Sequence, residues 1–177
     1  MMKKKLATVW LDGCSGCHMS FLDIDEKLLE VLQFFDIVYS PLVDFKEFPE
    51  SVDVTFVEGA ISTTEDIKKI KEIRKKSSII VAMGDCAITG NVPSMRNSFK
   101  LNSVIDRGYA ENSDKHNKVE FFDVPPLLTN VLPVNAIIHV NYYLPGCPPP
   151  ADAFYNLIKS ILNQEKFDVF QHTRFGK

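Results

Sequence analysis

Short apolar runs alternate with amphipathic stretches along most of the chain. The runs have the length of buried strands. They cover residues 6–11, 37–42, 52–57, 79–83 and 137–144. Between them, aliphatic side chains recur at helical spacing among charged residues, which predicts helices that begin near 20, near 62–64 and at 151. Strands that alternate with helices indicate an α/β fold. We expect a flavodoxin-like three-layer sandwich with a mostly parallel sheet.

The segment 87–133 interrupts this regular pattern. It contains four prolines and a polar stretch over 111–118, with a helix predicted near 94–105. A loop of this length inside a compact domain usually carries function or contacts a partner. We therefore expect residues 1–177 to form a single domain with a long excursion near 87–133.

The composition is that of an ordinary globular protein and excludes several functional classes. With 45% hydrophobic residues and a net charge of −3 over 177 residues, the chain is neither disordered nor basic enough to predict nucleic-acid binding. Its apolar runs fall far short of the roughly 20 residues that span a bilayer. The first apolar run is too short for a signal peptide, and no twin-arginine pair is present. We therefore expect a cytoplasmic protein with no nucleic-acid or membrane partner.

Each of the four cysteines lies just after a predicted strand. Cys14 and Cys17 follow the first strand. Cys86 follows the fourth strand and Cys147 follows the fifth. Because the carboxyl ends of parallel strands meet at one edge, where α/β proteins bind their ligands, we expect the four thiols to meet there. In a reducing cytosol, cysteines serve as ligands or catalysts more often than as disulfides. The four thiols therefore predict one metal site.

The spacing of the cysteines favours an iron–sulfur cluster over zinc. A structural zinc site usually has two paired knuckles, whereas Cys86 and Cys147 lie in separate loops. Cys147 is followed by Pro148, as in the Cys-Pro that closes ferredoxin motifs. Ligand softness and spacing thus favour a [4Fe–4S] cluster at the carboxyl edge of the strands. A zinc-stabilised binding module stays open as an alternative. So does a thioredoxin-like Cys-x-x-Cys, although it leaves Cys86 and Cys147 without a role.

Four motifs, taken in order and spacing, resemble the small subunit of [NiFe] hydrogenases. They are Gly13–Cys17, Val57–Gly59, Gly84–Cys86 and Pro145–Pro149. Each motif is weak alone, but the combination is specific, and the resemblance runs from about residue 6 to residue 162. Two further stretches narrow it to the small, electron-transfer subunit of the cytoplasmic, bidirectional, NAD-reducing hydrogenases. They are His18–Glu26 and Pro93–Asn97.

The resemblance implies a cofactor, partners and a reaction. It implies one [4Fe–4S] cluster, with ligands Cys14, Cys17, Cys86 and Cys147. It implies a large subunit with a Ni–Fe centre, and diaphorase iron–sulfur and flavin subunits that hold FMN, NAD and further iron–sulfur clusters. The chain would then relay electrons between these partners in the reaction H2 + NAD+ = NADH + H+. It would be a subunit of a hydrogen:NAD+ oxidoreductase (hydrogen dehydrogenase), would contain no catalytic residue and would be inactive alone.

A complex I-like iron–sulfur subunit that delivers electrons to quinone is the main alternative within the same resemblance. Such subunits have adjacent cysteines at the first motif, whereas two residues separate Cys14 from Cys17. This spacing argues for a hydrogenase. No cysteine follows Cys147, so we expect a single cluster whose electrons pass directly to a neighbouring subunit.

Three polar residues within these motifs each have two interpretations. Glu58 follows the third strand, and it is either a proton relay or polar support near the cluster, or a carboxylate that caps the following helix. His18 either makes a hydrogen bond near the cluster or is an ordinary residue at a helix start. Arg96 either contacts a partner or the cluster edge, or forms a surface salt bridge.

Overall fold

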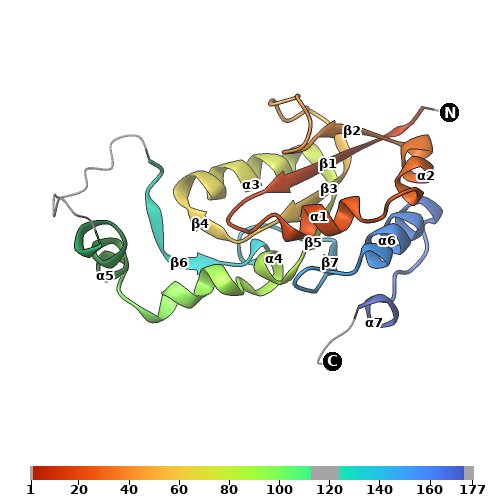
Figure 1. Cartoon of the computed structure of the whole chain (residues 1–177). Coiled ribbons are helices and arrows are strands. Elements are labelled where there is room, and N and C mark those ends of the chain that lie inside the picture. The colour runs from red at the N-terminus through yellow and green to blue at the C-terminus, as the bar shows by residue number, and fades with distance from the viewer. Residues whose placement is uncertain (1, 113–123, 174–177) are drawn as a thin grey trace.

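A parallel sheet lies at the centre of the computed structural model, which describes residues 2–112 and 124–173 (Figure 1). The strands are β1 (Lys4–Trp10), β2 (Phe35–Tyr39), β3 (Val52–Glu58), β5 (Ser77–Met83) and β7 (Tyr142–Leu144). They pair in the order β2-β1-β3-β5-β7, and every neighbouring pair runs parallel. This sheet confirms the predicted α/β fold.

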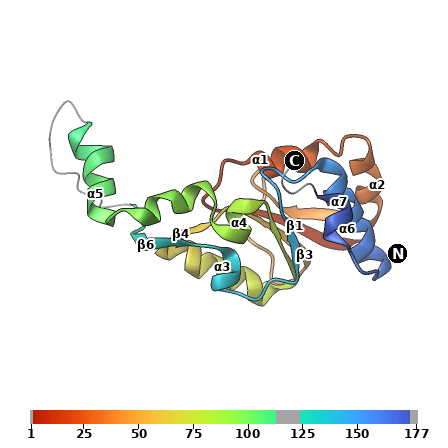
Figure 2. The same cartoon turned by 90° about the horizontal axis from the view of Figure 1, so that it is seen from below.

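Helices cover both faces of the sheet, as a three-layer sandwich requires (Figures 1 and 2). One face is covered by α1 (Gly16–Leu22), α2 (Lys27–Phe34) and α6 (Ala151–Asn163). The other face is covered by α3 (Thr64–Lys76) and α4 (Asp85–Thr89). A last short helix, α7 (Val169–His172), follows α6 and contacts it.

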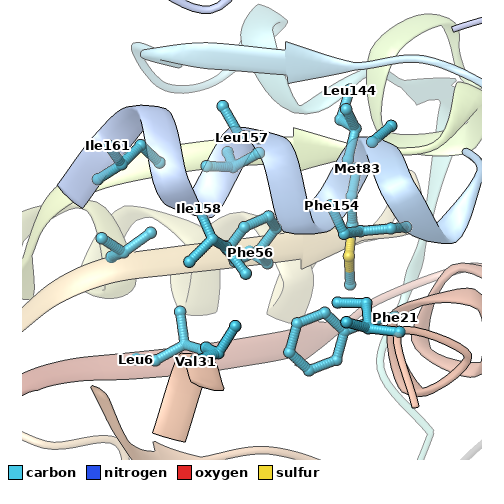
Figure 3. Packing of buried hydrophobic residues seen from close by; sticks show 14 of the residues in the cluster. Leu6, Phe21, Val31, Phe56, Met83, Leu144, Phe154, Leu157, Ile158 and Ile161 are labelled. Atoms are coloured by element: carbon cyan, nitrogen blue, oxygen red, sulfur yellow. The ribbon is translucent and has the colours of Figure 1, made fainter. Parts of the chain in front are cut away.

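Successive residues of the strands point to opposite faces, and this alternation separates two cores. On β3, Phe56 packs with α1, α2 and α6, whereas Val57 packs with α3 and α4. On β5, Met83 and Ala82 divide in the same way. Figure 3 shows Phe154 on α6 beside Phe56, with ring centroids 6.1 Å apart. The first core reaches α1, and it therefore supports the helix that carries Cys17.

The helix predicted near 62–64 is α3, and two side chains fix its first residue. The hydroxyl of Thr63 accepts the N–H of Asp66 at 3.0 Å, and the carboxylate of Asp66 accepts the N–H of Thr63 at 2.8 Å. This capping box satisfies two N–H groups near the start of the helix. Thr63 also ends β4 (Ile61–Thr63), a short strand that the sequence pattern does not predict.

The helix predicted from residue 20 is instead two short helices. Between α1 and α2, Asp25 has a φ of 54°. A right-handed helix cannot continue through a residue in this left-handed conformation, so it is interrupted there. The apolar stripe that the sequence predicts for this helix is Leu22, Leu28, Leu29, Leu32 and Phe35. It is wrong at three positions, because Leu22 and Leu29 are exposed and Phe35 is the first residue of β2.

The fifth predicted strand is shorter than the apolar run 137–144. Residues Val134–Ala136 form a 3-10 turn, η3, and only β7 pairs with the sheet. The side-chain oxygen of Asn141 accepts the N–H of Ile80 at 2.9 Å, and the N–H of Asn141 donates to the carbonyl of Ile80 at 2.9 Å. A side chain thus replaces one strand hydrogen bond at this point, and β7 begins at the next residue.

The helix predicted near 94–105 is confirmed only in part, because two separate short helices take the place of one. These are η1 (Val92–Ser98, 3-10) and α5 (Leu101–Ile105), and the π-helix η2 (Asp106–Glu111) follows them. A ribbon is made by β6 (Leu127–Leu132), which pairs antiparallel with β4. Figures 1 and 2 show the excursion projecting away from the sheet. Its polar stretch lies partly in 113–123, outside the described residues.

Arg96 and Asn97 attach η1 to this ribbon. Arg96 donates to the carbonyls of Thr129 and Ser62 at 3.2 and 3.4 Å. The side chain of Asn97 pairs with the backbone of Val131 in both directions, at 2.9 and 2.7 Å. Because Arg96 bonds to backbone carbonyls and not to a carboxylate, the prediction of a surface salt bridge is wrong for the described residues.

No helix within the described ranges is both long enough and apolar enough to span a bilayer.

Candidate functional site

Four strands of the sheet end in a single row. Trp10 of β1 pairs with Glu58 of β3, Glu58 with Met83 of β5, and Met83 with Leu144 of β7. Loops that start from this row therefore begin at the same edge of the sheet. The four cysteines lie within a few residues of the row, in the loops and first helical turns after β1, β5 and β7. They are Cys14, Cys17, Cys86 and Cys147.

The loop after β5 and the loop after β7 are bonded to each other. The N–H of Gly84 donates to the carbonyl of Leu144 at 2.8 Å. Next along the chain, the N–H of Asp85 donates to the carbonyl of Gly146 at 2.9 Å, and the carboxylate of Asp85 accepts the N–H of Gly146 at 2.8 Å. These bonds hold the backbone before Cys86 against the backbone before Cys147.

The first cysteine loop is joined to the other two at two points. The hydroxyl of Ser20 on α1 donates to the carbonyl of Pro149 at 2.5 Å. Gly84 lies directly against the thiol of Cys17, so a Cβ at this position would overlap the sulfur. Gly84 also has a φ of 81°, which side chains rarely tolerate. Glycine is therefore required at Gly84 both by the backbone conformation and by the close approach of Cys17.

The thiols lie close enough to influence one another electrostatically. Burial is the main cause that raises the pKa of Cys17, and the negative charges of Glu58 and the other three thiols raise it further. Burial also raises the pKa of Cys86, followed by the charges of Cys147 and Cys14. A bound metal reverses this preference, because a coordinating thiol gives up its proton.

The site has a buried side and an exposed side. Cys17 is buried, Cys86 is intermediate, and Cys14 and Cys147 are exposed. On the exposed side, the amide nitrogen of Asn91 lies 3.6 Å from the sulfur of Cys147, within reach of a weak N–H···S hydrogen bond. All four cysteines are free thiols. A group bound between them would thus have one side covered by the core and the other open at the surface.

In the described part of the chain, no three Cys, His, Asp or Glu side chains are placed to hold one metal ion. In a [4Fe–4S] cluster, each cysteine binds a different iron atom. This arrangement spreads the sulfurs further apart than the ligands of one zinc ion.

Glu58 lies beneath the first cysteine loop. Its side chain is almost fully buried, and one carboxylate oxygen accepts the backbone N–H of His18 at 3.1 Å and also contacts the ring Nδ1 of His18. Gly13 packs on the same carboxylate, since a Cβ there would lie 3.4 Å from it. Glu58 does not cap α3, because Thr63 and Asp66 do so. It supports the N-terminal turn of α1 instead.

His18 is the second buried polar residue of the site. Its Nδ1 faces Glu58, and its Nε2 is buried with no hydrogen-bond partner among the described residues. The interpretation of His18 as an ordinary residue at a helix start does not explain why its Nε2 is buried without a partner among the described residues.

Sequence reasoning did not single out Asp85, Ser20 or Asn91. Asp85 had a signal, because it lies between Gly84 and Cys86 in one of the motifs. Ser20 lies in the stretch His18–Glu26 that narrows the resemblance, whereas Asn91 lies in none of the motifs. Their contacts could not be predicted, because the partners Pro149 and Cys147 are distant in the sequence.

Comparison with protein families and known proteins identifies similar chains. The model of the family "NADH ubiquinone oxidoreductase, 20 Kd subunit" matches residues 14–161. The delta subunit of the NAD-reducing hydrogenase HoxS from Cupriavidus necator is 37% identical over 172 residues, which cover 94% of this chain and 82% of the relative. A subunit of the vhu F420-non-reducing hydrogenase from Methanocaldococcus jannaschii is 41% identical over 164 residues. That match covers 92% of this chain but only 57% of the archaeal relative.

Solved structures give the same result at the level of the fold. A chain of an NAD+-reducing [NiFe]-hydrogenase in its H2-reduced state superposes with a TM-score of 0.90 at 31% identity. The match covers 98% of this chain and 99% of that one. A chain of a [NiFeSe]-hydrogenase from Dm. baculatum superposes with a TM-score of 0.61 at 18% identity, and this likeness concerns the fold alone.

Proposed function

The chain belongs to the family of the NADH ubiquinone oxidoreductase 20 kDa subunit and is a hydrogenase-associated electron-transfer subunit. From this premise, we propose that it is the small subunit of an NAD-reducing [NiFe] hydrogenase. Its role would be to relay electrons between the large subunit and the diaphorase subunits, in the cytoplasm. We also propose that residues 1–177 form one domain. The observation that carries the proposal is the single row of strand ends, which directs the cysteine loops to one edge of the sheet.

We propose that this edge holds one [4Fe–4S] cluster, with ligands Cys14, Cys17, Cys86 and Cys147. The donor set supports this, because four thiolates suit an iron–sulfur cluster. The electrostatic influence of Cys86, Cys14 and Cys147 on the pKa of Cys17 also supports a common site for the four thiols. When bound, the cluster would supply one-electron transfer, and its potential would depend on burial and on hydrogen bonds to its sulfurs.

The residues around the thiols have distinct roles in this proposal. Gly84 leaves room for the sulfur of Cys17. Asp85 fixes the loop of Cys147 relative to the loop of Cys86. Glu58 gives polar support to the first cysteine loop. A proton relay through Glu58 stays a prediction.

The exposed side of the site supports the proposed partners. Cys14 and Cys147 lie at the surface, and large apolar side chains are exposed on the elements beside them. They include Trp10, Met19, Val92, Met95 and Phe99. Exposed apolar groups that gather around a site often mark protein interfaces. We propose that the large Ni–Fe subunit and the diaphorase subunits, with their FMN, NAD and iron–sulfur clusters, contact this side.

NAD as the acceptor is supported by two similar chains that belong to NAD-reducing hydrogenases. One is the HoxS delta subunit, at 37% identity, and the other is the solved chain that superposes with a TM-score of 0.90. Quinone as the acceptor, in a complex I-like subunit, is the weaker alternative because the two relatives described above are hydrogenase subunits.

The test is anaerobic purification of the tagged chain together with its natural partners. We expect a nickel-bearing subunit to co-purify, iron and acid-labile sulfide to be present, and H2 to reduce NAD+. Cys14→Ala should abolish the H2-dependent reduction, whereas Ser78→Ala, exposed at the opposite end of β5, should not. Absence of a nickel-bearing partner, zinc in place of iron, or full NAD+ reduction by Cys14→Ala would overturn the proposal.

A further inference from the structure

The ring of His18 is held in one orientation inside the site. A single carboxylate oxygen of Glu58 bonds both the backbone N–H of His18 and its ring Nδ1. Both side chains are about 98% buried. With the backbone and one ring nitrogen attached to the same oxygen, the ring has little freedom to turn, and the direction of its other nitrogen is fixed.

That other nitrogen has no partner in the described chain. The Nε2 atom of His18 is buried, and within residues 2–112 and 124–173 no group bonds to it. Buried polar atoms in proteins almost always have a hydrogen-bond partner. A ring held this firmly, with one nitrogen bonded and the other bare, indicates that the partner of Nε2 is a group other than the described residues.

The surroundings of the ring are the cysteine site. His18 follows Cys17 directly on α1. The carboxylate that anchors the ring acts on the thiols, because its negative charge adds to burial in raising the pKa of both Cys17 and Cys86. The bare nitrogen therefore belongs to a residue that is anchored within electrostatic reach of two of the proposed ligands.

Resting on the proposed function, we infer that His18 carries a proton on both ring nitrogens, so that Nδ1 donates to the carboxylate of Glu58 and Nε2 donates a hydrogen bond to a sulfur of the [4Fe–4S] cluster. Glu58 is then the positioning residue that holds the ring for this bond. Hydrogen bonds to cluster sulfurs raise the reduction potential. His18 would therefore tune the potential of the cluster without being a ligand of any iron atom.

Two substitutions separate the two ring nitrogens. The amide nitrogen of glutamine lies close to the place of histidine Nε2, and the amide nitrogen of asparagine lies close to the place of Nδ1. His18→Gln should keep the proposed bond to sulfur. His18→Asn should keep the contact with Glu58 and lose the bond to sulfur. The two variants bury similar amide groups, so a general loss of packing would affect both.

The experiment is a redox titration of the purified complex, followed by the EPR signal of the reduced cluster. We expect His18→Asn to lower the reduction potential, and His18→Gln to stay close to the natural chain. Equal potentials in all three proteins, or equal shifts in both variants, would overturn the inference while the cluster itself remained.

A second measurement takes its decisive result from the natural complex. In the complex containing 15N-histidine, pulsed EPR should detect a nitrogen coupled to the reduced cluster, and His18→Gln made in the same way should lack it. If the natural complex shows no such coupling, the inference is wrong. If the natural complex contains no iron and sulfide, the proposed function fails, and the inference fails with it.

Discussion

Asp85 and Gly146 bond to each other in both directions, although 60 residues lie between them in the chain. The backbone N–H of Asp85 donates to Gly146, and the side chain of Asp85 accepts in return. One residue thus sets the distance between the loop of Cys86 and the loop of Cys147.

Asp85→Ala should loosen the loop of Cys147 and reduce the iron and sulfide content of the complex. We expect unfolding free energy to fall by about 1.5–3 kcal/mol, the usual range for a hydrogen bond to a charged group. Asp85→Asn is the matched variant, because its amide oxygen still accepts the N–H of Gly146. Iron and sulfide analysis, together with urea unfolding, gives both quantities. Equal cluster content in the alanine and asparagine variants would contradict this role for the side chain.

Gly84→Ala should prevent the first cysteine loop from packing. The new Cβ would overlap the sulfur of Cys17, and the backbone at Gly84 has a φ of 81°. With a ψ of 159°, this backbone conformation is one that essentially only glycine adopts, and it costs roughly 1–3 kcal/mol in a residue with a side chain. We expect loss of the cluster and lower resistance to urea. Gly108→Ala is the control, because no atom lies within 4 Å of a Cβ there. An intact cluster in Gly84→Ala would show that the loop can shift.

Phe154→Ala should destabilise the fold without touching the cysteines directly. Phe154 is fully buried, and its ring centroid lies 5.8 Å from that of Phe21 on α1. Removal of a buried phenylalanine costs about 3–5 kcal/mol. Leu29→Ala, at a side chain that is 68% exposed, should cost far less. Urea unfolding of the metal-free proteins measures both losses, and equal losses would be evidence against the core described for α6.

Asp152→Asn should lower the free energy of unfolding near neutral pH but not in acid. The hydrogen bond and charge of Lys27, at 2.8 Å, lower the pKa of Asp152 below its usual value of 3.8. A lowered pKa in the folded state stabilises the protein above the unfolded value, and this stabilisation is lost as the pH falls through the folded value.

The urea midpoints of Asp152→Asn and the natural chain should therefore differ most near neutral pH and converge in acid. The pair is exposed, so the difference should be small and should shrink in high salt. A difference that persists below the folded pKa, or is indifferent to salt, would contradict this account.

The cysteine edge could be predicted because it depends on a property that parallel strands share. Cys147 lies at the expected edge even though its strand is much shorter than predicted, since β7 still ends at Leu144. The end of a strand is what positions a loop, and the apolar run marks that end correctly.

The contacts within the edge could not be predicted in the same way. The contact between Glu58 and His18 depends on the conformation of a loop, and hydrophobic periodicity does not predict loop conformation. The excursion has no single period either, because its turns are 3-10, α and π in succession. Asp25 interrupts a helix whose charged and apolar residues otherwise follow a helical pattern.

The hydrogen bond from Ser20 to Pro149 joins residues that are 129 positions apart. During synthesis on the ribosome, Cys14 and Cys17 leave the exit tunnel long before Pro149 exists. The early part of the chain therefore exposes two thiols before the loops that later pack against them, after β5 and β7, have been made. The fourth thiol is present only after Cys147 has been made, so a group that needs all four ligands can bind only to a nearly complete chain.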